Sequence, residues 1–199
     1  MLAMTPILAV AVLLAALVIL WAVLIYNGLV KSRIRVDEAW STVDVQLKRR
    51  ANLVPNLVET VAGYASHERE TLEAVARARQ QLQAADGAKA AFAANTVLDR
   101  ALGRLLAVVE RYPDLKASTG FVALQRELSD LEEKIAFARQ FYNRCVLEYN
   151  ARTETLPSSI IAGVADFRPR GFFELDEPAQ VPEVRFASRG DQTDESRRG

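Results

Sequence analysis

The sequence predicts an all-α protein, in which an N-terminal transmembrane helix is followed by an up-and-down antiparallel four-helix bundle. Two observations lead to this prediction. Residues 7–25 form an uninterrupted run of nineteen apolar residues; as a helix this run is about 28 Å long, close to the roughly 30 Å hydrocarbon core of a bilayer. From residue 28 to 156, apolar residues recur at helical spacing and show no sustained alternation of the kind seen in strands.

The apolar run is expected to stay in the mature protein as a transmembrane helix over residues 7–26. A cleaved signal peptide is the alternative, but it would need a basic start and a shorter apolar core. Residues 1–6 contain neither Lys nor Arg. Trp21 and Tyr26 lie toward one end of the run, where amphipathic rings favour the membrane interface.

Basic residues follow the run directly, at Lys31, Arg33 and Arg35. Under the positive-inside rule, this asymmetry places the body in the cytoplasm and residues 1–6 outside it. These features predict a single crossing of the membrane, with the body on the cytoplasmic side. The three cations are also candidate contacts with anionic lipid headgroups.

Pro, Gly and Asn residues, which tend to interrupt helices, divide the body, residues 28–156. The four predicted helices span 28–51, 55–85, 88–111 and 118–156. Pro55 decides between two architectures: a break before it, or one kinked helix that continues to residue 85. The break is favoured because the residue before a proline is pushed away from the helical region. Lys48, Arg49 and Arg50 would then lie at a helix C-terminus, where cations are stabilising. These three residues are otherwise expected to be solvated, with weak ion pairs.

The last predicted helix carries a heptad stripe typical of a coiled coil. Its members are Phe121, Leu124, Leu128, Leu131, Ile135, Ala138, Tyr142, Cys145 and Tyr149. Tyr142-Asn143 and Tyr149-Asn150 repeat seven residues apart on this stripe, and their rings are expected to pack while their hydroxyls find partners near the bundle edge. Residues 157–186 are predicted to be irregular apart from one short helix near 158–164, packed on the bundle or on the membrane surface. Residues 187–199 are polar and predicted to be disordered.

Composition argues against several classes of function. Lys+Arg and Asp+Glu balance at 25 each, so no basic surface favours nucleic acid. His67 and Cys145 are the only residues of their kinds, so a histidine–cysteine metal site or nucleophile triad is not expected. His67 is expected at the surface and Cys145 in the core. No catalytic, cofactor-binding or metal-ligating residue is assigned.

The body resembles the LemA family. The resemblance rests on ordered stretches of the chain: RVDEAWSTVDVQLKRR (35–50), NLVPNLVETV (52–61), GRLLAVVERYPDLKAS (103–118), LQREL (124–128), KIAFARQFYN (134–143) and EYN (148–150). It extends over about residues 20–186. It implies a bacterial membrane protein with one N-terminal span and a helical body, and it implies no catalytic reaction.

The function predicted from these features is that of a non-enzymatic membrane-anchored helical bundle that docks or scaffolds other proteins or assembles with itself. Helix faces outside the bundle seam would make the contacts. The alternative is a lipid-sensing or membrane-remodelling protein that acts through the juxtamembrane helix and residues 157–173. Besides the three juxtamembrane cations, the candidate partner or membrane contacts are Asn52 and Asn56, expected as capping amides of a helix turn, and Phe172 and Phe173.

Overall fold

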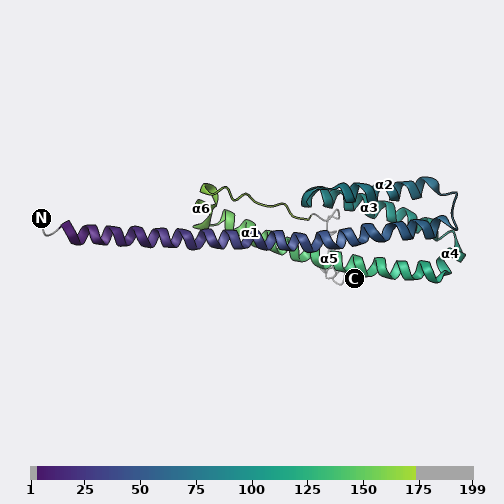
Figure 1. The fold of residues 1–199 in the computed structure, drawn as a ribbon, viewed down its shortest axis with the longest axis horizontal. Coiled ribbons are helices and arrows are strands. Elements are labelled where there is room, and N and C mark those ends of the chain that lie inside the picture. The colour runs from purple at the N-terminus through teal and green to yellow at the C-terminus, as the bar shows by residue number, and fades with distance from the viewer. Residues whose placement is uncertain (1–3, 174–199) are drawn as a thin grey trace, which may run out of the picture.

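The computed structural model describes residues 4–173, and all regular structure in that range is helical (Figure 1). The helices are α1 (Met4–Ala62), α2 (Arg69–Ala84), α3 (Gly87–Val109), α4 (Pro113–Ala117), α5 (Thr119–Glu154) and α6 (Ser158–Val164). The all-α prediction is confirmed for these residues. Residues 1–3 and 174–199, which include the predicted disordered tail, lie outside the described part of the chain.

The first helix does not break at Pro55. α1 continues for 59 residues, from Met4 to Ala62, with Pro55 inside it. The predicted boundary between 51 and 55 is therefore wrong, and so is the alternative of one helix reaching residue 85. The chain instead turns over residues 63–68, where Gly63 and Ala65 hydrogen-bond back to the carbonyls of Glu59 and Val61.

A side chain of α2 explains why the helix passes through Pro55. Proline has no N–H, so the carbonyl of Ala51 loses its usual helical donor, and such a loss normally kinks or breaks a helix. Arg79 supplies the missing hydrogen bond, because its Nε donates to the Ala51 oxygen at 2.8 Å. The partner lies 28 residues away in the sequence, beyond the reach of local pattern analysis.

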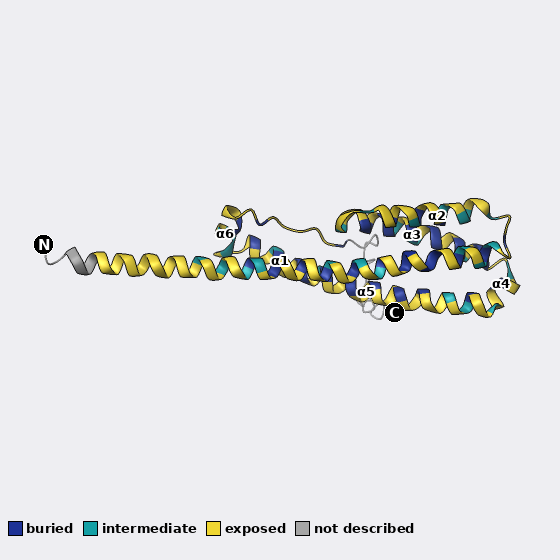
Figure 2. Ribbon diagram, in the orientation of Figure 1, coloured by how far each residue is buried: buried dark blue, intermediate teal, exposed yellow. Residues whose placement is uncertain are grey.

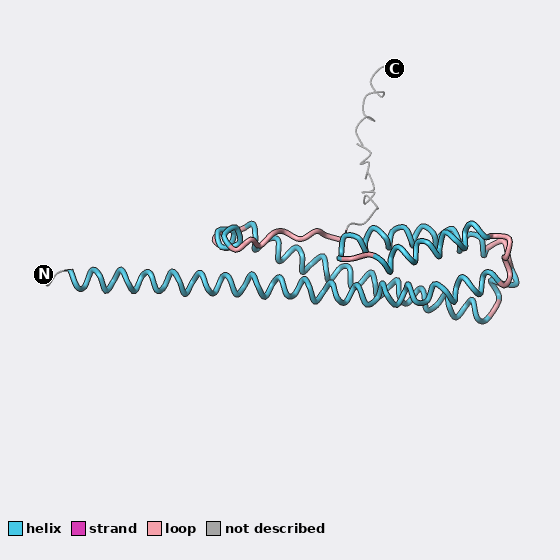
Figure 3. The backbone as a smooth tube through the Cα atoms, turned by 45° about the horizontal axis from the view of Figure 1, so that its top comes forward, coloured by secondary structure: helices cyan, strands magenta, loops and turns pink. Residues whose placement is uncertain are grey.

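α5 and the α2–α3 pair both lie alongside the distal part of α1 (Figures 1 and 3). α5 packs along α1, and the α2–α3 pair packs together and against α1, while α6 packs against both α1 and α5. Gly87 allows the tight α2–α3 turn because its φ is +76°, a conformation that side chains disfavour. Ser118 begins α5 by accepting a hydrogen bond from the Phe121 N–H at 3.2 Å.

Burial divides α1 into two parts (Figure 2). Its most apolar 18-residue stretch, long and apolar enough to cross a membrane, has a mean hydropathy of 3.2 and none of its residues is buried. From Leu29 onward, the helix buries a single stripe through Val36, Val43 and Leu47. The heptad stripe of α5 is likewise buried, apart from the half-buried Leu124. The core therefore begins where the apolar run ends.

After α6 the chain runs back over the body in an extended path, visible as the long loop in Figure 3. We call residues 166–173 the strap. The strap buries Phe167 and Phe173, whereas Phe172 remains 44% exposed. Of the two locations predicted for this region, the strap thus takes the one on the helical body.

Candidate functional site

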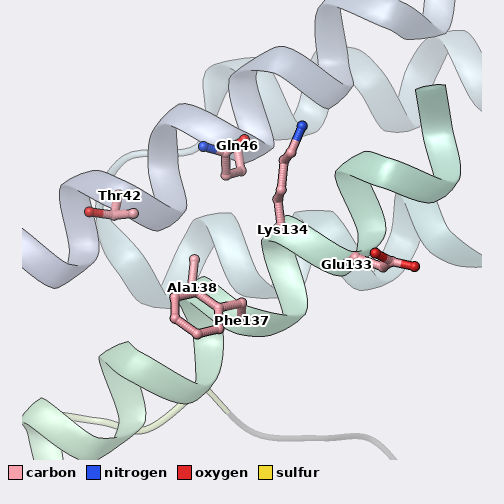
Figure 4. Close-up of a pocket in the computed structure, with 6 residues that line it drawn as sticks. All are labelled: Thr42, Gln46, Glu133, Lys134, Phe137 and Ala138. Atoms are coloured by element: carbon pink, nitrogen blue, oxygen red, sulfur yellow. The ribbon is translucent and has the colours of Figure 1, made fainter.

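An exposed apolar groove lies between α1 and α5 (Figure 4). We call it the α1–α5 groove; it is a shallow depression of about 300 Å³, lined by Thr42, Gln46, Glu133, Lys134, Phe137 and Ala138. Phe137 is 73% exposed, and Phe141, one helical turn further along α5, is 42% exposed. Val45 on α1 is 43% exposed. Large apolar side chains this accessible, next to a well-packed core, are typical of a contact surface.

Gln46 adds a polar feature to this groove. Its Oε1 is buried and has no hydrogen-bond partner among the described residues. A buried acceptor without a donor costs free energy. The groove therefore combines exposed aromatic area with one unsatisfied acceptor.

One buried arginine, Arg50, connects α1 with α3 and α5. The Arg50 side chain is only 3% exposed and forms ion pairs with Asp99 of α3 and Glu132 of α5. Its Nη1 also donates to Asn95 Oδ1 at 2.9 Å, and Asn95 Nδ2 donates to Asp99 at 3.0 Å. The expectation that Arg50 is solvated is therefore wrong. Lys48 and Arg49 are exposed as expected.

The charges in this network are only partly compensated. Burial raises the pKa of Glu132 above its ordinary value of 4.5, although Arg50 lowers it. Burial also lowers the pKa of Arg139, although Asp99 and Glu132 raise it. Desolvation is therefore the larger effect on both groups. The arrangement fixes the register of α1, α3 and α5, since a displaced helix would leave Arg50 buried without its partners.

The repeated Tyr-Asn pairs of α5 hold the strap, and we call these four residues the Tyr-Asn clamp. Tyr142 and Tyr149 donate through their hydroxyls to the carbonyls of Gly171 and Arg168, at 3.1 and 3.0 Å. Each asparagine both donates to and accepts from one strap residue: Asn143 pairs with Phe173, and Asn150 with Arg170. The predicted hydroxyl partners near the bundle edge are thus main-chain carbonyls.

The spacing of the clamp matches the geometry of an extended chain. Seven residues of α-helix advance about 10.5 Å, and three residues of extended chain advance about 10 Å. Each Tyr-Asn pair therefore makes the same kind of contact with the strap. The strap residues bound by one pair lie three positions from those bound by the other. The clamp forms its hydrogen bonds with main-chain groups of the strap. In the sequence, the clamp is marked by the seven-residue repeat of the Tyr-Asn pairs.

The strap ends in an aromatic cluster drawn from α1, α3 and α5. The Phe173 ring lies 3.8 Å from that of Phe92, and Phe92 in turn contacts Trp40 and Tyr142 at 5.2 and 5.6 Å. The Arg139 guanidinium lies 3.8 Å from the Phe173 ring centre. Phe173 is therefore a core residue, and its predicted role as a partner or membrane contact is wrong. Phe172 beside it is 44% exposed and lies level with the same cluster, about 22 Å along α1 from the apolar run.

The three juxtamembrane cations are all exposed, but they differ in their contacts. The Arg33 guanidinium lies 5.1 Å above the ring of Phe167, and Arg35 faces Glu148 at 3.9 Å. Lys31 has no acidic partner among residues 4–173. Lys31 and Arg33 therefore remain available beside the end of the apolar run.

Asn52 and Asn56 lie on the outer side of the continuous α1. No turn exists at these positions, so their predicted capping role is wrong; within the helix, the Thr60 hydroxyl donates to the Asn56 carbonyl at 2.7 Å. The structure does not bring them together with the α1–α5 groove or the clamp.

His67 and Cys145 lie where they were predicted. His67 is exposed in the 63–68 connection and Cys145 is buried. Burial raises the pKa of the Cys145 thiol, with a further contribution from Glu148. Among the described residues, no group of three or more His, Cys, Asp or Glu side chains is arranged to hold a metal ion.

Residues 39–186 match the LemA family. Protein LemA of Metamycoplasma hominis is 26% identical over 156 residues, which cover 78% of this chain and 71% of that protein. Magnetosome protein MamQ of Magnetospirillum gryphiswaldense is 27% identical, with 80% and 70% covered. Magnetosome protein MamQ 1 of Paramagnetospirillum magneticum is also 27% identical, with 79% and 67% covered. The family match spans well over half of the chain, and the chain belongs to the LemA family.

Proposed function

We propose that this protein is a non-enzymatic, single-pass, membrane-anchored scaffold that docks partner proteins through its α1–α5 groove. The single observation that carries the proposal is the exposure of Phe137 and Phe141 beside a packed core. Two aromatic side chains one turn apart suit the apolar face of an amphipathic partner helix.

We propose further that the body acts as one antiparallel four-helix bundle with coiled-coil-like packing, formed by α1, α2, α3 and α5. The support is the alternating direction of these helices and the Arg50 network, which ties α1 to α3 and α5 through side chains. A rigid body of this kind keeps the groove residues at fixed positions on α1 and α5.

The proposed anchor is the apolar first part of α1, and the proposed site is the inner membrane of a bacterium. Support for the span comes from its length, its hydropathy and its complete exposure, since a helix that is apolar all round needs lipid or a large core. The exposed cations after the span support a cytoplasmic body. Because α1 is continuous, the groove would stand about 30 Å from the end of the apolar run.

The absence of enzymatic activity is likewise a proposal. Cys145 is the one thiol of the chain, and burial raises its pKa, which makes it a poor nucleophile. Asp99 and Glu132 serve Arg50 as ion-pair partners.

Photocrosslinking in intact cells tests the docking proposal. A benzophenone amino acid placed at Phe137 of the full-length protein is expected to give discrete adducts, and Phe141→Ser should reduce their yield. Mass spectrometry then identifies the partner. An adduct of two copies of the 22.0 kDa chain would assign the groove to self-assembly.

The matched control places the benzophenone amino acid at Val97, a residue of α3 that is 41% exposed. Adducts should be absent there. Equal labelling at positions 97 and 137, or no adduct at 137, would overturn the docking proposal. Normal melting of the Phe141→Ser protein would show that the loss of adduct is not a loss of fold.

A further inference from the structure

We propose that α6 is a second membrane contact, lying in the headgroup region with Leu156, Ile160 and Val164 turned to lipid. This inference rests on the proposed membrane anchor in α1. It goes beyond that anchor because it assigns a lipid-binding surface to a segment far away in the sequence and excludes the neighbouring strap from it.

The depth of α6 follows from its packing on α1. Ser158 and Arg152 line a shallow depression together with Trp21, Ile25 and Gly28 of α1. The ring of Phe167, just after α6, meets that of Tyr26 at 5.6 Å. These α1 residues mark the end of the apolar run, where Trp and Tyr favour the membrane interface. Figure 1 shows α6 at this end of the body, beside the N-terminal part of α1.

One face of this segment is apolar and uncovered. Leu156, Ile160 and Val164 follow one another at intervals of four, and they are 77%, 60% and 86% exposed. Ala162, on the opposite side of α6, is buried against the body. Ile160 and Val164 are four residues apart within α6, so they share a helix face and point away from the packed side; the exposed Leu156 lies just before the helix begins. At the depth of Trp21 to Gly28, the surroundings on that side are membrane interface.

A helix of one to two turns binds lipid weakly when it is free, because its apolar face is small. Here the cost of ordering is already met by folding, since α6 packs against both α1 and α5. The anchor also makes the contact intramolecular, which raises the effective concentration of lipid at α6. Three exposed apolar side chains are therefore enough to hold it at the surface.

The charges around α6 fit the same location. Lys31 and Arg33 are exposed one turn or more beyond the apolar run, and Arg152 reaches the Gly28 carbonyl at 3.4 Å. Cations at this level meet anionic headgroups, while the apolar groups beside them enter the acyl boundary. The strap behaves differently, because it leaves α6 and runs away from the membrane toward Phe92.

Environment-sensitive labelling tests the proposal with the full-length protein in vesicles of phosphatidylethanolamine and phosphatidylglycerol. Single cysteines at Ile160 and Val164, in a Cys145→Ala background, carry a nitrobenzoxadiazole dye. We expect blue-shifted emission at both positions and quenching by nitroxides attached to lipid. A cysteine at Leu14 serves as the membrane control, and one at Val97 as the matched exposed apolar control in water.

The control at Leu14 separates this inference from the proposed anchor. Labels at 160 and 164 that behave like the label at 97, while Leu14 is quenched by lipid, would overturn the α6 contact and leave the anchor intact. A blue shift without lipid quenching would place a protein on this face and also overturn the lipid assignment. An aqueous label at Leu14 would refute the anchor and, with it, this inference.

Discussion

The two parts of α1 belong to one continuous helix, yet they differ in which of their side chains are buried. In the first part, apolar residues occupy every side and all 18 residues of the most apolar stretch are unburied. In the second part, one side is buried, and Val36, Val43 and Leu47 on it are at most 2% exposed.

This difference shows what a helix needs from its surroundings. A stripe can be covered by neighbouring helices, whereas a helix that is apolar all round needs either a large core or lipid. The boundary lies between Ile25 and Leu29, where α6 joins α1. The junction between the two environments is thus built from residues that are far apart in the sequence.

The largest expected effect comes from making the same substitution in both parts. Leu47→Ala should lower the free energy of unfolding of the body by about 2–5 kcal/mol, because it leaves a cavity in a packed site. Leu14→Ala should leave body unfolding unchanged, since Leu14 contacts no part of the core. Denaturant melts of the full-length protein in detergent measure both. Equal effects of the two variants would contradict the division of α1.

The next effect concerns the charges that the packed part contains. Asp99→Ala combined with Glu132→Ala leaves the 3% exposed Arg50 side chain without an acidic partner. A buried unpaired charge costs several kcal/mol, but both acids are more than 40% exposed, so water can enter; we expect about 2–3 kcal/mol. Each single variant should cost much less, because the other acid remains. Additive single effects in a double-mutant cycle would refute the shared network.

A smaller effect is expected at the Tyr-Asn clamp. Asn150→Ala removes the two hydrogen bonds to Arg170, which are together worth about 1–2 kcal/mol. The strap should then open locally, without global unfolding. Hydrogen exchange at residue 170 should accelerate, while exchange in α3 stays slow. Faster exchange throughout the body would show that the strap is part of the global core instead.

The smallest effect is a pH dependence at Glu132. Its pKa is raised in the folded protein, first by burial, so the folded state binds this proton more tightly than the unfolded state. Its contribution is therefore unfavourable above the folded pKa, and the penalty is relieved as the pH falls through the folded pKa toward 4.5. Because the group is half exposed, we expect less than about 1 kcal/mol. Glu132→Gln should flatten stability over that window in urea melts; an unchanged profile would contradict the shift.

Features that depend on only a few helical turns could be predicted from the sequence. The helical class, the apolar run, the buried heptad stripe of α5 and the buried Cys145 all depend on a residue's nearest neighbours along one helix. The exposure of Phe137 could be predicted only indirectly, from its position off the heptad stripe of α5. Its place beside Thr42 and Gln46 depends on the register of α5 against α1, which is a property of the packed structure.

The sequence by itself therefore determined the all-helical class and which side of α5 is buried, because both follow from local periodicity. Only the tertiary structure decided that α1 passes through Pro55, that Arg50 is buried and that Phe173 enters the core. In each case the deciding partner is distant: Arg79 is 28 residues from Ala51, Glu132 is 82 from Arg50, and Asn143 is 30 from Phe173. A lone proline or arginine predicts a break or a solvated charge, and the outcome changes when folding brings a donor to the free carbonyl or carboxylates to the buried guanidinium.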